Sequence, residues 1–208
     1  MDCTTQRIPS EIKKDSFRLR YKVYCEEMGL SSPNASHDSK EIKDAIDDHA
    51  IIVNYYKNNV CASTFRVNIL SDGTGGVFED LYNIDLHLGR DKLAVLTKLM
   101  VHPNHRKSRA SYYVVRDACM IGLIRSVRYA YIDCAPDLME YYEKWGFVIN
   151  GEPFNHYETG HVTPMRLDYD NIDYLRSIKS PCAKIYDEFN TLERGSISFS
   201  SRCENTWQ

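Results

Sequence analysis

The stretch LAVLTKLMVHPNHRKSRASYYVVRDACMIGLIRSV, residues 93–127, decides the fold. Its first part, 93–101, is apolar and β-prone, which predicts a strand that closes at His102-Pro103. A basic stretch, 104–109, follows, and an apolar-periodic segment then predicts a helix over about 110–127. A strand that leads onto a helix N-terminus presents unpaired backbone N–H groups and the positive end of the helix dipole. Such a place is suited to hold a phosphate group.

The segments after this stretch again alternate between strand and helix. Residues 129–134 predict a strand, and the next helix begins at Pro136 and ends at Gly146, where glycine can take the left-handed conformation. Two further strands and a last helix are expected at 147–150, 163–168 and about 170–188.

The segments before it predict a helix and a β-hairpin. A helix is expected over about 10–28, ending at Gly29, and residues 30–43 have the Ser, Pro, Asn and Asp content of a loop. Two strands, at 49–56 and 60–70, are joined by the turn residues Lys57-Asn58-Asn59. The order α-β-β-β-α-β-α-β-β is that of a mixed α/β fold. Because no repeat or linker is visible, we expect one domain over 1–194, with a helical extension from about 170 and a polar tail at 195–208.

Composition limits the classes of protein to which the chain can belong. Of its 208 residues, 43% are hydrophobic and 26% charged, which supports a buried core and argues against wholesale disorder. A formal net charge of −3 argues against a globally basic partner of nucleic acids. The first twenty residues lack the apolar core of a signal peptide, and no stretch reaches the roughly 18 apolar residues of a membrane-spanning helix. Seven cysteines without a CxxC pair favour reduced thiols over a metal site. We therefore expect a cytoplasmic protein with no integral membrane segment, no metal and no nucleic-acid partner.

Two motifs in and after the opening stretch resemble those of the GNAT acyltransferase superfamily. Val101, Pro103 and Arg106 match a strand that ends in V-x-P and the arginine that begins the phosphate-binding loop, and 142–147 matches Y-E-K-x-G-F. The resemblance implies a three-layer fold in which helices flank a central splayed mixed β-sheet. It also implies that the phenol of Tyr142 donates a proton to the leaving thiolate of a thioester.

The loop before the 110–127 helix departs from the family pattern. Lys107, Arg109 and Ser111 replace glycines, so side chains occupy positions where bare backbone usually approaches coenzyme A. The basic loop suits a phosphopantetheine phosphate or the acidic surface of a carrier protein, and it also suits a solvated charge run that caps a helix. The resemblance assigns acyl-donor binding to Leu99, Met100, Val101, Arg106, Lys107, Ser108, Arg109, Ala110 and Ser111.

Further motifs resemble the autoinducer-synthase-like branch, which includes acyl-homoserine-lactone synthases and long-chain N-acyl amino acid synthases. These motifs are FRLRYKVYCEEMG (17–29), D-x-x-D-x-H-A (44–50), ASTFRV (62–67) and TPM (163–165). In this branch an ionic cluster lies near the acceptor. By motif position its members are Arg20, Asp44, Asp47 and Arg66, of which we assign Arg20, Asp44 and Arg66 to acceptor binding. The other interpretation of the two arginines is ordinary surface ion pairing.

The base that removes the proton from the acceptor amine stays open at this point. The E-x-S-R motif of the branch falls on Val95, Thr97 and Lys98, so no carboxylate is present at position 95. The candidates are Asp47, Asp48, His49, Glu79 or an ordered water. His49 is also explained as a hydrogen-bonded structural residue at the start of a strand, and Cys134 as an inert thiol in the core. The expected catalytic residues are Tyr142, Lys98, Asp47 and Glu79.

Together the motifs predict an N-acyltransferase that moves an acyl group, expected to be fatty, onto the amine of an amino acid or similar small molecule by direct attack. Backbone N–H groups around 98–101 would stabilise the oxyanion. Acyl carrier protein or coenzyme A would deliver the acyl group as a co-substrate, and we expect no permanently bound cofactor. The alternatives are an acetyl-coenzyme A N-acetyltransferase acting on a small amine or protein, and a non-catalytic binding domain with the same fold.

Overall fold

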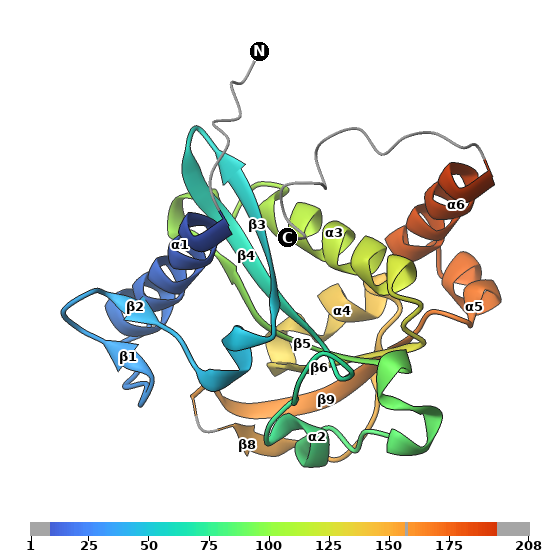
Figure 1. Cartoon of the computed structure of the whole chain (residues 1–208), viewed down its shortest axis with the longest axis horizontal. Helices are drawn as coiled ribbons and strands as arrows, with labels where there is room; N and C mark the ends of the chain where they lie inside the picture. The colour runs from blue at the N-terminus through green and yellow to red at the C-terminus, as the bar shows by residue number, and fades with distance from the viewer. Residues whose placement is uncertain (1–8, 157, 195–208) are drawn as a thin grey trace.

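A seven-stranded mixed β-sheet forms the centre of the chain, seen here in a computed structural model that describes residues 9–156 and 158–194 (Figure 1). The strand order is β3-β4-β5-β6-β9-β7, and β8 also pairs with β9. Within this sheet β5 and β6 run parallel, and the other paired strands run antiparallel. A separate hairpin is formed by β1 and β2. The strands are β1 (Ala35–Ser36), β2 (Glu41–Ile42), β3 (Ile51–Lys57), β4 (Val60–Ile69), β5 (Leu93–Val101), β6 (Tyr129–Cys134), β7 (Val148–Ile149), β8 (Phe154–His156) and β9 (Gly160–Asp168).

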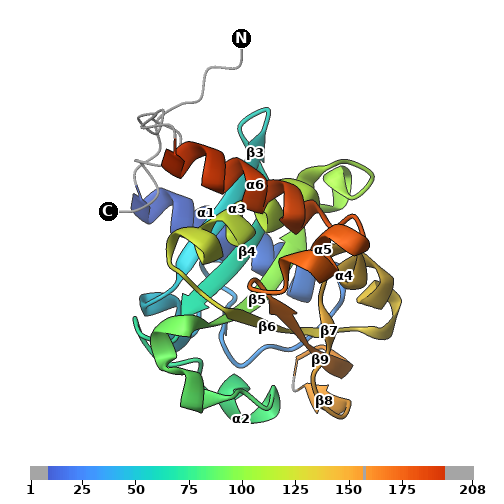
Figure 2. The same ribbon diagram turned by 90° about the vertical axis from the view of Figure 1, so that its right-hand side faces the viewer.

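Helices cover both faces of the sheet (Figure 2). On one face α3 packs on β3, β4 and β5 through buried residues such as Val114 and Ala118, and α6 packs on α3. On the opposite face, Ser16 of α1 hydrogen-bonds with Thr64 of β4 over 2.7 Å. The three-layer arrangement predicted from the sequence is therefore confirmed. The α-helices are α1 (Pro9–Tyr21), α2 (Phe78–Leu81), α3 (Ala110–Ile124), α4 (Met139–Trp145), α5 (Ile172–Ser177) and α6 (Pro181–Arg194), and the π- and 3-10 segments are η1 (Lys22–Glu27), η2 (Ala45–Asp48), η3 (Leu86–Leu88), η4 (Arg90–Lys92), η5 (Pro103–His105) and η6 (Pro136–Leu138).

A bulge interrupts β5 shortly after its last residue paired with β6. Between Thr97 and Met100, β5 has two residues where β4 has one between the corresponding partners. The first of the two, Lys98, has a φ of +59°, in the left-handed region that residues with a side chain rarely adopt. An extra residue bends a strand and re-aims its side chains. The bulge therefore directs the side chain of Lys98 away from the regular alternation of the strand.

Several elements form where the sequence predicts them. The strands β5 and β6 have the predicted bounds, 93–101 and 129–134. The turn between β3 and β4 places Asn58 and Asn59 at φ values of 51° and 61°, as a two-residue type I′ hairpin requires. The helix predicted over 10–28 also forms, but its last part, Lys22–Glu27, is a π-helix, a form that is frequent at functional sites.

Other predictions are wrong or incomplete. The single helix expected over about 170–188 is two helices, because Lys179 has a left-handed φ of 57° and Pro181 begins a new helix. The expected loop at 30–43 contains the β1–β2 hairpin, and β8 is a strand that the sequence does not reveal. The tail expected at 195–208 lies outside the described residues. No helix in the described part of the chain is both long and apolar enough to cross a membrane.

Candidate functional site

The sheet opens between β5 and β6. The two strands pair over three residues each, and the last pair is Val95 and Tyr131. Beyond it β5 continues along β4, and β6 continues along β9. The facing edges, residues 96–101 and 132–134, therefore carry backbone N–H and C=O groups that the neighbouring strand does not bind. This opening is where the sequence predicts the thioester carbonyl, and we call it the splay.

The D-x-x-D motif before β3 delivers two carboxylates to one face of the sheet through a capping box. Asp44 precedes the 3-10 turn η2, and its Oδ1 accepts a hydrogen bond from the backbone N–H of Ile46 over 3.0 Å. In return, Asp47 Oδ2 accepts from the backbone N–H of Asp44 over 2.9 Å. This reciprocal arrangement orients both side chains through local hydrogen bonds.

Two buried arginines meet these carboxylates and form the arginine–aspartate cluster of Arg20, Asp44, Asp47 and Arg66. Arg20 Nη1 donates to both carboxylate oxygens of Asp47 over 2.9 and 2.8 Å. Arg66 Nη1 lies 2.6 Å from Asp44 Oδ1 and 3.2 Å from Asp47 Oδ1. Both arginine side chains are 0% exposed, so the interpretation of ordinary surface ion pairing is wrong. Four residues from three segments are thus held as one buried unit.

The cluster leaves some guanidinium N–H groups without a protein acceptor. Arg66 also donates from Nε to Thr97 Oγ1 over 2.8 Å, which ties the cluster to β5 beside the splay. Among the described residues, Nη2 of Arg66 and both Nε and Nη2 of Arg20 have no hydrogen-bond partner. Burial alone would raise the pKa of Asp47, but the charges of Arg20 and Arg66 outweigh it and hold that pKa below its usual value. Asp47 is therefore a poor candidate for the base.

Lys98 pairs with a residue that the sequence analysis did not single out. Its Nζ forms a buried ion pair and hydrogen bond with Glu158 in the turn between β8 and β9. Glu158 Oε1 also accepts from the hydroxyl of Ser32 over 2.8 Å, and Lys98 Nζ lies 5.0 Å from the ring centre of Tyr24 in the π-helix. Burial lowers the pKa of Lys98 despite the opposing charge of Glu158. The pair thus connects β5, the segment between the π-helix and β1, and the β8–β9 turn beside the splay.

The phenol of Tyr142 lies in the core on the α3 side of the sheet. Its side chain is buried and packs edge-on against Phe147, with ring centres 5.7 Å apart. Burial raises the pKa of Tyr142 well above its ordinary value, so the phenol keeps its proton. Its helix ends at Gly146, which has a φ of 102° and where an added Cβ would lie 2.2 Å from Leu175 Cδ2. Only glycine fits there, which gives a physical reason for the G of the Y-E-K-W-G-F motif.

The predicted donor loop is exposed and only partly paired. Arg106 forms an ion pair with Glu27 at the end of the π-helix. Lys107 and Arg109 are exposed, and in the described part of the chain neither forms an ion pair. Helix α3 begins directly afterwards at Ala110, and the side chain of its N-cap residue, Arg109, makes no capping hydrogen bond. The loop therefore presents free positive charge beside a helix N-terminus.

A family model described as N-acyl amino acid synthase FeeM matches residues 15–168. The chain belongs to this family. Because the chain belongs to this family, it is an acyltransferase, as predicted from the sequence. Family membership also argues against the alternative of a non-catalytic binding domain. No curated protein matches the sequence.

Solved structures similar to this FeeM-family chain include autoinducer synthases and an N-acyl amino acid synthase. TofI, in a ternary complex with an inhibitor and MTA, has a TM-score of 0.65 at 17% identity over 87% of this chain and 96% of that chain. BjaI, a CoA-dependent acyl-homoserine lactone synthase with SAM and isopentyl-CoA, has a TM-score of 0.61 at 15% identity, covering 83% and 84%. FeeM from uncultured soil microbes has a TM-score of 0.58 at 15% identity, covering 78% and 93%. At these identities the likeness shows the shared fold.

Some predicted site residues of the FeeM-family chain lie apart from the arginine–aspartate cluster. Glu79 packs near Val95, since a Cβ on Gly75 would lie 3.0 Å from Glu79 Cγ and 3.3 Å from Val95 Cγ2. However, its carboxylate binds Arg90 over 2.8 Å, and these hydrogen bonds lower the pKa of Glu79 to about 2. Asp48 is exposed and pairs with Lys43 over 2.7 Å, and His49 is exposed.

The structure also brings residues to the splay that sequence reasoning missed, namely Asp133, His156 and Glu158. Asp133 comes from β6, and the other two come from β8 and the turn after it. The YAYIDC strand contains Asp133, but nothing local indicates that it faces a site. His156 and Glu158 depend on a strand, β8, that the sequence does not reveal.

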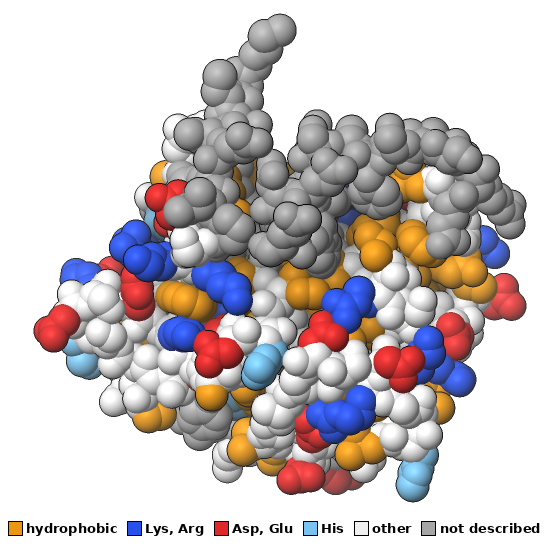
Figure 3. Space-filling model, viewed as in Figure 1, with side chains coloured by type: hydrophobic (Ala, Val, Ile, Leu, Met, Phe, Trp, Pro, Cys, Tyr) orange, Lys and Arg blue, Asp and Glu red, His pale blue; other side chains and the backbone are white. Residues whose placement is uncertain are grey.

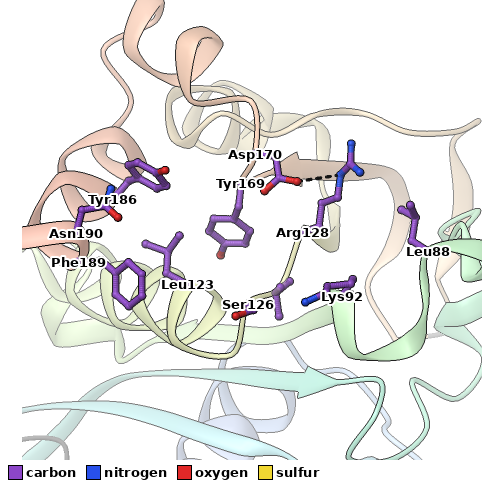
Figure 4. A pocket seen from close by; sticks show the side chains of 11 residues that line it. Leu88, Lys92, Leu123, Ser126, Arg128, Tyr169, Asp170, Tyr186, Phe189 and Asn190 are labelled. Carbon is purple, nitrogen blue, oxygen red and sulfur yellow. Dashed lines mark ion pairs between the residues drawn. The ribbon is translucent and has the colours of Figure 1, made fainter. Parts of the chain in front are cut away.

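A pocket of about 440 Å³ lies at the opposite end of β6, away from the splay (Figure 4). Its rim includes Arg128, which precedes β6 and pairs with Asp170 over 3.3 Å, and its apolar wall includes Phe189 of α6 and Leu123 of α3. None of the predicted site residues lines it.

Proposed function

We propose that this chain forms an amide by moving a fatty acyl group from a thioester directly onto the amine of an amino acid. The observation that carries the proposal is the end of β5–β6 pairing at Val95, which leaves residues 96–101 paired with β4 but without a partner strand on the β6 side. Arg66 lies beside this opening on the α1 side, and Tyr142 belongs to the core on the α3 side. The amine and the thioester would thus approach from opposite faces.

The arginine–aspartate cluster suits the carboxylate end of an amino acid. Its two positive and two negative charges balance, yet Nη2 of Arg66 has no acceptor among the described residues. A carboxylate that accepts from a buried guanidinium gains a strong charge-assisted hydrogen bond. Arg20, Asp47 and Asp44 would act as positioning residues that hold Arg66 in place.

The donor would be held by the exposed loop and the start of α3. The free charges of Lys107 and Arg109 support binding of a phosphopantetheine phosphate with the acidic surface of a carrier protein around it. On the described part of the face drawn in Figure 3, acidic and basic side chains are interspersed. Coenzyme A is the other candidate donor, since the similar structure BjaI is a CoA-dependent acyl-homoserine lactone synthase.

The chemical step needs no covalent enzyme intermediate. The neutral amine adds to the thioester carbonyl, and backbone N–H groups of residues 99–101 stabilise the oxyanion. Addition forms the C–N bond, and collapse of the intermediate restores the carbonyl, breaks the C–S bond and transfers the phenol proton of Tyr142 to the leaving thiolate. The nitrogen loses one proton, which replaces the proton that Tyr142 gave up, so that the products are a neutral amide and a thiol.

The test is a panel of purified thioesters, from acetyl to palmitoyl on carrier protein and on coenzyme A, each offered with a mixture of amino acids. We expect free-thiol release that depends on the amino acids, an N-acyl amino acid in the mass spectrum, and faster turnover of long chains. Faster turnover of acetyl-coenzyme A than of every longer donor would favour the acetyltransferase alternative. Thiol release without an amide product would contradict the proposal.

A further inference from the structure

Asp133 occupies the position across the splay from Thr97. Val95 pairs with Tyr131 in parallel register, and side chains two residues on in each strand, Thr97 and Asp133, point to the same face. This is the face that carries Arg66, because Arg66 Nε donates to Thr97 Oγ1. A carboxylate is thus supplied to the α1 side of the splay by β6, whereas position 95 of β5 has none.

His156 is fixed next to Asp133 with a defined tautomer. Its Nδ1 accepts hydrogen bonds from the backbone N–H groups of Glu158 and Thr159 over 3.1 and 3.3 Å. The proton of the neutral ring must therefore be on Nε2, which lies 3.9 Å from Asp133 Oδ2. The ring stacks parallel to Phe78, with centres 5.7 Å apart. Packing and the β8–β9 turn together aim an N–H at the carboxylate.

Asp133 differs from the other acidic residues near the splay in its partners. Asp44, Asp47 and Glu158 each bind a buried cation. Among the described residues, Asp133 forms no ion pair with lysine or arginine, and its side chain is 20% exposed while that of His156 is 5% exposed. It is therefore both accessible and free to take up a proton.

The electrostatic surroundings of Asp133 favour that role. The titratable groups that face it are His156 from β8, Lys98 from β5, Tyr82 after α2 and Tyr142 from α4. Burial raises the pKa of Asp133, and the nearby His156, Tyr82 and Lys98 oppose this only in part. Burial also lowers the pKa of His156, which keeps the ring neutral. A carboxylate with a raised pKa is a stronger base than an ordinary one.

We propose that Asp133 is the general base of the acyl transfer and that His156 is its positioning residue; this rests on the proposed function. As the neutral amine attacks and the C–N bond forms, Asp133 takes the N–H proton. As the C–S bond breaks, Tyr142 gives its proton to the thiolate. Asp133 then returns its proton to the Tyr142 phenolate, directly or through water, so that both groups are reset and the products are an amide and a thiol.

The first test compares Asp133→Asn with Asp137→Asn, which makes the same change at an exposed residue four positions further on. We expect Asp133→Asn to lower kcat about 10²–10⁴-fold, the usual range for a general base, with the KM for the thioester unchanged. With hydroxylamine, a weakly basic amine that is neutral at pH 7, the fall in kcat caused by Asp133→Asn should be at least tenfold smaller. Asp137→Asn should retain wild-type turnover.

The second test uses His156→Asn, because an asparagine Oδ1 can still accept the two backbone N–H groups while the Nε2 proton is lost. We expect kcat to fall less than in Asp133→Asn. The acid limb of the kcat/KM profile against pH should move to higher pH, since the Asp133 carboxylate loses a nearby hydrogen-bond donor. An unmoved acid limb would overturn the role of His156.

The outcomes separate the two proposals. An active wild type with an unaffected Asp133→Asn variant, or an equal deficit with amino acids and hydroxylamine, would overturn the base assignment alone. A wild type that makes no amide from any thioester and amine would overturn the proposed function and the base assignment together.

Discussion

Replacing Arg66 with methionine tests whether the arginine–aspartate cluster is a buried unit. Arg66 is 0% exposed and contacts Asp44 at 2.6 Å, Asp47 at 3.2 Å and Thr97 at 2.8 Å. Methionine fills much of the same volume, but within the cluster, as the described residues form it, Arg20 is then left to balance two carboxylates. Removing one member of a buried ion pair costs about 3–5 kcal/mol. For a chain of this size, that corresponds to a fall in Tm of about 6–20 °C.

The pH dependence of this loss follows from Asp47. Its folded-state pKa is lowered because the charges of Arg20 and Arg66 outweigh burial. Its contribution to stability is therefore present above the unfolded-state pKa of about 3.9 and is lost as the pH falls through the lower folded value. In Arg66→Met the folded pKa rises. The stability gap between wild type and variant should thus be full at pH 7 and narrow as the pH falls below about 4.

The assay is reversible urea unfolding at pH 7 and near pH 3, with Arg18→Met as the matched control. Arg18 lies in the same helix as Arg20, but its side chain is 58% exposed and pairs with Glu41 at 3.3 Å. Its removal should cost at most about 1 kcal/mol. If Arg66→Met were no less stable than Arg18→Met at pH 7, the description of a buried, interdependent cluster would be refuted.

Three further predictions concern the donor side of the site. Tyr142→Phe should lower kcat about 10²-fold or more by removing the phenol proton, with the acceptor KM unchanged; full kcat would exclude Tyr142 as the acid. The double variant Lys107→Glu/Arg109→Glu should raise the KM for a carrier-protein donor and weaken its salt dependence, whereas the control Lys184→Glu, at an exposed residue of α6, should do neither. An unchanged KM in the double variant would argue against docking at this loop. Gly146→Ala should cost about 2–5 kcal/mol, from left-handed strain and the 2.2 Å approach to Leu175, and calorimetry showing wild-type stability would contradict that geometry.

Local sequence signals were sufficient for much of the fold. The apolar runs that became β5 and β6 and the Asn58-Asn59 turn act through short-range pattern and conformational preference, so the residues themselves indicate the structure. The break at Lys179 was missed because the apolar period continues across it, and only the left-handed φ and Pro181 divide the helix.

The site was less accessible to sequence reasoning than the fold. Motif positions brought Arg20, Asp44, Asp47 and Arg66 together correctly, but their complete burial depends on how α1 packs on the sheet. Asp133 could not be recognised from the sequence, because its place depends on the β5–β6 register and on where pairing stops.

Binding of a thioester in the splay is tested most directly by amide hydrogen exchange with a non-hydrolysable acyl thioether of the donor. Binding should slow exchange at residues 96–101 and at the start of α3, and it should leave β3 unchanged. Protection confined to other parts of the chain, with 96–101 exchanging as in the free protein, would show that the thioester does not bind in the splay.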